Sequence, residues 1–314
     1  MNKKLLLAAS FSVLCSIFGI SQQDKLTTNF IYDKMSLNPG STGLDEGICG
    51  TTIYRNQWDR INGAPNSAIF NLEANMNRFF PGGIGLSFYH DAIGFNRQNN
   101  VLLNYSYPLE IGGAGKLGIG LGVGIINFGM NPEWVPPTTA VDNSLPVGWN
   151  STNLDLNFGL YFKGESDYYF GLSSTHLSET LLKQSVGGID YQYQTKRHYY
   201  IMGGKKFSQI GPGDIDAQVL LKTELVKFQA DVMVRYMYSQ MLNGVYGGLL
   251  YRSSDAISLV LGCSPIPNFT VGYSYDVNTH KLSGVSRGSH EVVLKYCYFL
   301  PPPPIQKSKH PRWL

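Results

Sequence analysis

The run Lys116-Leu-Gly-Ile-Gly-Leu-Gly-Val-Gly-Ile125 alternates bulky aliphatic residues with glycine without a break. A period of two places every aliphatic side chain on one face of a β-strand. The opposite face is nearly bare, which suits a tightly curved wall that faces a crowded lumen. Shorter alternating stretches recur along the chain. Segments of about ten residues with this alternation, separated by turns, are typical of a transmembrane β-barrel.

Alternation and turn residues together predict about fourteen antiparallel strands. Their approximate cores are 50–57, 66–77, 83–90, 100–108, 115–128, 152–163, 168–175, 197–206, 215–223, 226–238, 244–252, 256–263, 268–276 and 288–299. If the chain enters the first strand from the periplasm, the connections after odd strands lie outside the cell, where outer-membrane barrels carry their longer loops. The longest connections, 129–151, 176–196 and 277–287, all follow odd strands. The connection at 224–225 is very tight for an outside loop.

The two ends of the chain differ from the barrel region. Met1-Asn-Lys-Lys4 precedes an uncharged apolar stretch over 5–20, which is followed by polar residues. This order is typical of a cleaved secretory signal peptide, and the apolar stretch is too short to span a bilayer as a helix. We therefore divide the chain into four parts. They are a signal peptide (1–21), an N-terminal periplasmic segment (22–49), an outer-membrane β-barrel (50–300) and a Pro-rich basic C-terminal tail (301–314).

The composition fits a membrane barrel better than a soluble domain. Charged residues make up 15% of the chain, whereas soluble domains usually carry about 25%. The 35 Gly and 20 Tyr suit a barrel with aromatic rings at both membrane interfaces. No stretch after the signal peptide is long and apolar enough for a transmembrane helix. The net charge of +3 gives no argument for nucleic-acid binding.

Three cysteines follow the signal peptide, and their spacing does not suggest a metal site. Cys49 precedes the first predicted strand and Cys297 lies in the last. In a closed barrel these strands are neighbours, so the two cysteines have the opportunity to form a disulfide. The other interpretation is that all three are isolated small apolar residues, and it is the one we expect.

The face opposite the apolar one carries polar and charged residues of both signs. The candidates for the lumen are Asp155, Asn157, Gln218, Lys222, Gln229, Asp231, Arg235, Asp276, Glu291 and Lys295. Such residues either line a water channel or cross-link into a salt-bridged plug. Fourteen strands enclose room for both arrangements.

Candidate partner-binding residues lie in the loops and in the tail. They are Trp58, Trp134, Trp149, Lys307, Lys309, Arg312 and Trp313. Trp134 and Trp149 flank a Pro-rich outside loop, where tryptophan suits protein recognition. The alternative is a loop that packs its own tryptophans over the barrel mouth. Four prolines favour an extended spacer before the basic tail, which either docks on periplasmic machinery or has no role.

Several local motifs occur in order with consistent gaps. They are Asn29–Gly43, Tyr54-Arg-Asn-Gln-Trp58, His90-Asp-Ala-Ile-Gly94, Gly272-Tyr-Ser-Tyr-Asp276 and Gly288-Ser-His-Glu291. This order resembles the PorP/SprF family of outer-membrane proteins of the Bacteroidetes, over about residues 27–299. The resemblance implies a barrel of the type IX secretion system. Its partners would be outer-membrane lipid, a secreted surface protein and components of the secretion and gliding machinery.

The positions that carry the resemblance are Asn38, Pro39, Tyr54, Arg55, Asn56, Trp58, Gly272, Tyr273, Tyr275, Gly288, His290 and Glu291. We expect Asn38-Pro39 to form a turn that fixes the N-terminal segment at the periplasmic mouth. Trp58 is expected at the outer interface, and Arg55 faces either a partner or a lumen carboxylate. The resemblance carries no catalytic role. The 129–151 and 176–196 loops and the C-terminal tail depart from the family pattern.

No motif for catalysis, phosphate binding or zinc binding occurs, and the six histidines are scattered. We therefore expect no enzyme activity, no cofactor and no metal site. The leading hypothesis is a non-enzymatic barrel that helps to secrete or anchor a partner protein. The second is a passive channel for small solutes, which requires a lumen not closed by loops or by residues 22–47. The third, a hydrolase, requires a nucleophile, a base and an orienting group within hydrogen-bonding reach.

Overall fold

The computed structural model describes residues 25–132, 148–186, 189–238, 240–253, 255–279 and 284–301. Its strands are β1 (Ile48–Asn56), β2 (Asn66–Asn75), β3 (Gly83–Ile93), β4 (Asn96–Glu110), β5 (Gly115–Met130), β6 (Trp149–Gly164), β7 (Tyr168–Thr175), β8 (Leu181–Val186), β9 (Ile189–Gln194), β10 (His198–Ile210), β11 (Gly213–Thr223), β12 (Phe228–Tyr238), β13 (Val245–Arg252), β14 (Ala256–Ile266), β15 (Phe269–Asn278) and β16 (Ser289–Tyr298).

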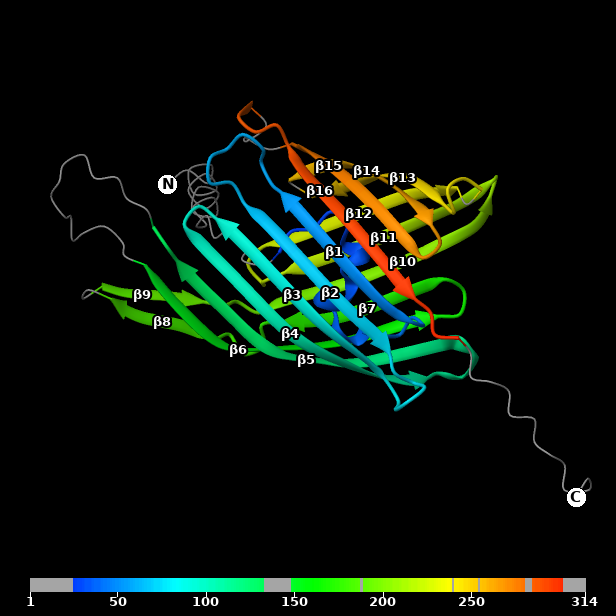
Figure 1. Cartoon of the computed structure of the whole chain (residues 1–314), viewed down its shortest axis with the longest axis horizontal. Helices are drawn as coiled ribbons and strands as arrows, with labels where there is room; N and C mark the ends of the chain where they lie inside the picture. Colours follow the sequence, from blue (N-terminus) through cyan, green and yellow to red (C-terminus); the bar gives the residue numbers. More distant parts are fainter. Residues whose placement is uncertain are drawn as a thin grey trace, which may run out of the picture.

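Fourteen of these strands form one closed antiparallel barrel (Figure 1). Each strand pairs with its neighbour along the chain, and β1 pairs with β16 to close the wall. All fourteen predicted strands are therefore confirmed. The strands β8 and β9 form a separate hairpin that the sequence analysis assigned to the 176–196 loop. Figure 1 shows this hairpin extending beyond the barrel next to β6.

The two ends of the barrel carry different connections. The long connections, 131–148, 176–197 and 279–288, lie at one end, which we call the outer end. Short turns join the strands at the other end, which faces the periplasm by the usual rule for these barrels. The connection between β11 and β12 is a tight turn at the outer end, with Leu225 at a φ of 67°.

The Gly-rich run lies in β5, between the long strands β4 and β6. Its glycines face the lumen, whereas Leu121 and Val123 point outward and are about half exposed. On the neighbouring β4, Leu103 is 66% exposed. Exposed aliphatic side chains on most other strands extend this apolar outer surface, which suits contact with lipid.

Residues 25–47 lie inside the barrel, and we call them the N-terminal plug (Figure 1). This plug belongs to the N-terminal segment that we delimited as 22–49, and it contains three short helical turns. They are η1 (Phe30–Tyr32), α2 (Lys34–Leu37) and η2 (Pro39–Ser41), and a further turn, η3 (Gly112–Ala114), joins β4 to β5. Phe30, Leu37 and Leu44 pack in one apolar cluster with strand residues such as Met233. Burying each large apolar side chain contributes about 1.5–3 kcal/mol.

Cys49 and Cys297 form a disulfide between β1 and β16, where they are direct register partners. Our expectation of isolated cysteines is therefore wrong for this pair. Barrel closure brings together two residues that are separated by 248 positions in the chain. Cys263 is free. No helix among the described residues is long and apolar enough to cross a bilayer.

Candidate functional site

The inward-facing glycines of the wall form a groove for the plug. A Cβ atom on Gly118 or Gly120 of β5 would collide with the backbone of Pro39-Gly40. On β6, a Cβ on Gly159 would collide with the side-chain amide of Asn38. Only glycine therefore lets the wall and the plug backbone approach this closely. The bare face of the alternating run is explained by the chain segment that it contacts.

Asn38 fixes the middle of the plug in this groove. Its Oδ1 accepts a hydrogen bond from the Gly40 backbone N–H at 2.9 Å, which caps η2. Its Nδ2 donates to the carbonyls of Leu160 on β6 and Leu172 on β7, at 3.0 and 3.3 Å. One fully buried amide therefore orders the plug turn and joins it to two strands. Our expectation that Asn38-Pro39 lies at the periplasmic mouth gave the turn correctly, but the structure places it inside the lumen.

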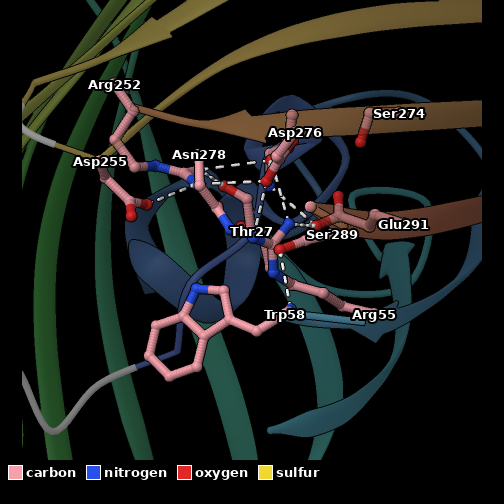
Figure 2. Close-up of polar contacts among 12 residues, drawn as sticks. Thr27, Arg55, Trp58, Arg252, Asp255, Ser274, Asp276, Asn278, Ser289 and Glu291 are labelled. Atoms are coloured by element: carbon pink, nitrogen blue, oxygen red, sulfur yellow. Dashed lines mark hydrogen bonds and ion pairs between the residues drawn. The ribbon is translucent and has the colours of Figure 1, made fainter. Parts of the chain in front are cut away.

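The beginning of the plug is held by a buried charge cluster at the outer end (Figure 2). Arg55 of β1 is 3.1 Å from Glu291 of β16 and 2.6 Å from Asp276 of β15. Glu291 accepts the backbone N–H groups of Thr28 and Asn29 at 2.9 and 2.7 Å. Each charge has an opposite partner, which buried charges need in order not to destabilise the fold.

Arg252 of β13 completes this cluster from the other side. Its Nε lies 3.1 Å from Asp231, and its Nη2 donates to the Thr27 carbonyl at 2.9 Å. The Thr28 hydroxyl donates to Asp276 at 2.8 Å. Four charged side chains from four strands therefore bind one short stretch of the plug, and Asp231 supports Arg252 from a fifth strand.

Two further polar centres hold the plug below this cluster. Asp33 forms a salt bridge with Lys25 and accepts a hydrogen bond from Asn71 of β2 at 2.7 Å. Arg235 of β12 forms a salt bridge with Asp216 of β11 and donates to the Tyr32 hydroxyl. The contacts of the plug therefore reach strands on opposite sides of the wall.

The plug ends at the short-turn end of the barrel. The Gly43 N–H donates to Glu73 at 3.0 Å, and the Gly43 carbonyl accepts from Asn75 at 2.8 Å. Because Thr28 lies at the outer end, the plug crosses the lumen along its length before it enters β1. Its backbone groups thus bond to wall side chains, which replaces the water they would lose on burial.

The family model of the type IX secretion system membrane protein PorP/SprF matches residues 20–296. The chain belongs to the PorP/SprF family. This membership and the closed barrel with its apolar outer face place the protein in the outer membrane. No curated protein sequence matches the chain.

Solved structures share the barrel fold at low sequence identity. The CymD monoaromatic hydrocarbon channel has a TM-score of 0.50 and 13% identity, and the match covers 86% of this chain and 93% of that chain. The TodX deltaS2S3 mutant monoaromatic hydrocarbon channel has a TM-score of 0.44 and 8% identity, and the match covers 82% of this chain and 92% of that chain. The KdgM porin has a TM-score of 0.37 and 11% identity, and the match covers 80% of this chain and 99% of that chain. At 13% identity the likeness to the CymD channel shows the fold alone.

Most of the residues predicted for the lumen of this PorP/SprF protein are buried there. Nine of the ten candidates are buried, and Lys295 lines a cavity beside the plug. Asp231, Arg235, Asp276 and Glu291 enter salt bridges, as the plug alternative requires. The prediction for the lumen did not include the plug residues Thr28 and Asn29, nor Arg252, which donates to the Thr27 carbonyl. The alternation around Leu250 and Arg252 places both on one face, which was the available signal for Arg252.

The other PorP/SprF motif positions divide between the two faces of the wall. Arg55 meets lumen carboxylates, which was one of its two expected environments. Tyr54 is exposed on the outer face, and Gly272 faces Tyr246 inside. Tyr273 and His290 share a hydrogen bond of 2.7 Å between neighbouring strands. The remaining positions form the end of β1 (Asn56) and the β15–β16 region (Tyr275 and Gly288), where the Tyr275 hydroxyl donates to the Arg287 carbonyl.

The partner-binding candidates have different outcomes. Trp58 follows β1 at the outer rim, at a φ of 55°. Its backbone N–H donates to the Ser289 hydroxyl at 3.2 Å (Figure 2). Trp149 is only 8% exposed and packs on Phe128, which itself stacks on Tyr193 of β9. It therefore braces the outer hairpins. The candidates outside the described residues are Trp134, Lys307, Lys309, Arg312 and Trp313.

Proposed function

We propose that this PorP/SprF protein is a plugged outer-membrane platform on which the type IX machinery secretes or anchors a partner surface protein. The observation that supports this proposal is the plug itself. Residues 25–47 are held in the lumen by hydrogen bonds to buried charged side chains of the wall and by apolar contacts. A solute would have to break these contacts in order to pass, so a role as a passive channel is the less favoured alternative.

A platform acts through the surfaces at its two ends. At the outer end the β8–β9 hairpin extends beyond the barrel next to β6, the strand that the 131–148 connection joins to β5 (Figure 1). Phe128, Trp149 and Tyr193 pack together at the base of both connections, which gives them a common support. Partner choice suits such loops, because loops vary while the wall that carries them stays fixed.

The test is purification of the tagged protein from detergent-solubilised outer membranes, with identification of the proteins bound to it. Recovery of a large secreted surface protein or of periplasmic secretion components supports the proposal. A second version replaces residues 133–147 by a Gly-Ser linker of equal length, which leaves β5 and β6 intact. We expect loss of partner display at the cell surface with the barrel still inserted.

The matched control replaces residues 280–286, in another outer connection, in the same way. If the first replacement leaves display unchanged, the outer loop does not choose the partner. If the tagged protein is purified alone and conducts ions in planar bilayers, the channel alternative replaces the proposal.

A further inference from the structure

A cavity of about 230 Å³ lies between the plug and the wall at the short-turn end. The plug contributes Lys34 and Asp45 to its lining, and the wall contributes Glu73, Tyr161, Lys163, Tyr169, Asp216 and Lys295. Asp167, in the short turn between β6 and β7, also lines the cavity. The side chains of Lys163 and Asp45 are 46% and 69% exposed, so the cavity opens toward the periplasmic side.

Most charges in the lining already have partners. Lys163 forms a salt bridge with Asp45, and Asp216 forms one with Arg235. Glu73 accepts the Gly43 backbone N–H. These groups are therefore committed to holding the plug and the wall together.

Lys34 and Lys295 differ from the other two lysines of the lining, Lys163 and Lys206, which form salt bridges with Asp45 and Asp214. Within the described part of the chain, neither ammonium group forms a salt bridge. The Lys34 Nζ lies 3.3 Å from the Tyr161 hydroxyl and 3.8 Å from the centre of the Tyr169 ring. Burial lowers the pKa of Lys34 to about 8, the Asp45 carboxylate raises this pKa in part, and the like charge of Lys295 lowers it. An anion between the two ammonium groups would relieve this repulsion.

The lining also has an apolar component. Tyr161 and Tyr169 stack with ring centres 5.2 Å apart and lie directly beneath the Lys34 ammonium. Aromatic rings give a flat surface for a small ligand body, while the charged groups fix its orientation. A water molecule takes about 30 Å³, so the cavity has the volume of about seven water molecules. This is room for one or two residues of a peptide.

We propose that this cavity binds a carboxylate group of a peptide that reaches the barrel from the periplasm, between Lys34 and Lys295 and over the Tyr161–Tyr169 pair. Lys34 belongs to the plug and Lys295 to β16, so the site exists only when the plug is in place. The carboxylate is either an acidic side chain or a free C-terminus, because both present the same group. This proposal does not depend on the platform function, since it concerns a different end of the barrel.

The test uses the full-length purified protein in detergent micelles and fluorescence polarisation of three pentapeptides carrying a dye of zero net charge. One peptide has a glutamate side chain and an amidated C-terminus, one is neutral with a free C-terminus, and one is neutral and amidated. We expect one of the carboxylate peptides to bind about tenfold more tightly than the neutral amidated peptide. The stronger of the two identifies the source of the carboxylate.

The variants Lys34→Gln and Lys295→Gln are each expected to weaken this binding about fivefold or more, since each removes one charge-assisted hydrogen bond. Lys34→Arg and Lys295→Arg keep the charge and retain binding. The control is Lys116→Gln, which removes an exposed lysine paired with Glu110 at the same end of the barrel. Equal binding of all three peptides, or equal loss in the control, overturns the proposal. If a variant does not fold, the peptide comparison on the unchanged protein still decides.

Discussion

At the scale of single residues, Glu291 has a central role because it binds both the plug and the wall. Its two oxygens accept the N–H groups of Thr28 and Asn29 and also face Arg55. In the variant Glu291→Gln the new amide NH2 group faces these N–H donors, and Arg55 keeps Asp276 as its ionic partner. We expect the free energy that holds the plug in the lumen to fall by about 3 kcal/mol. Trypsin cleavage after Lys25 and Lys34 measures this loss, and should become on the order of a hundredfold faster.

The control for this prediction is Glu110→Gln. Glu110 forms an exposed salt bridge with Lys116 outside the lumen, and such pairs contribute little. Cleavage at the unchanged rate in both variants would mean that the charge cluster does not hold the plug.

For these residues the sequence predicts the face of the wall but not the binding partner. A period of two assigns Asp231, Asp276 and Glu291 to the lumen face without any structure. It does not reveal what they bind, because Thr28 and Glu291 are separated by 263 positions. Hydrogen bonds between such distant residues depend on barrel closure and on the path of the plug, and neither leaves a local periodic signal.

At the scale of elements, the contact between β5 and the plug depends on the absence of a side chain. Gly120→Ala adds a Cβ atom that overlaps the Pro39-Gly40 backbone. We expect the plug to be displaced while the β4–β5–β6 pairing remains, because backbone ladder bonds do not involve the new methyl group. Hydrogen exchange of the peptides that contain residues 28–44 should become faster.

The matched control is Gly50→Ala in β1, where an added Cβ atom meets no atom within 4 Å. Exchange of the same plug peptides should stay at the level of the unchanged protein. Equally fast exchange in both variants would point to a general effect of replacing strand glycines.

The seam between β1 and β16 gives a second prediction for an element. The disulfide Cys49–Cys297 joins the first and last strands, which closes a loop of nearly the whole barrel. In Cys49→Ser we expect the barrel to lose about 2–4 kcal/mol of stability, since a cross-link restricts the unfolded chain. The urea midpoint followed by the electrophoretic shift of the folded barrel measures this. Cys263→Ser should leave the midpoint unchanged, because Cys263 is free.

Strands were predictable to different degrees for a physical reason. Every barrel strand has one face on lipid and one on the lumen, so its alternation is strong. The β8–β9 hairpin lies outside this environment, and we assigned it to a loop. Its sequence did contain a signal, because Gly187-Gly188, a dipeptide that favours a two-residue hairpin turn, precedes the alternating stretch 189–194. The path of the plug had no comparable signal.

At the scale of the whole molecule, the plug determines whether the barrel is closed or conducting. Deletion of residues 26–46 removes the helical turns η1, α2 and η2 and their apolar contacts but no strand residue. The wall should still form, because its ladder pairs join only strands. An emptied barrel of fourteen strands has a wide interior lined by polar residues, which admits water and ions. We therefore expect the deletion protein to conduct in planar bilayers and the unchanged protein to be nearly silent. The variant Glu291→Gln should lie between them, with brief openings, because it weakens the plug without removing it. If the unchanged protein conducts as well as the deletion protein does, solutes pass beside the plug.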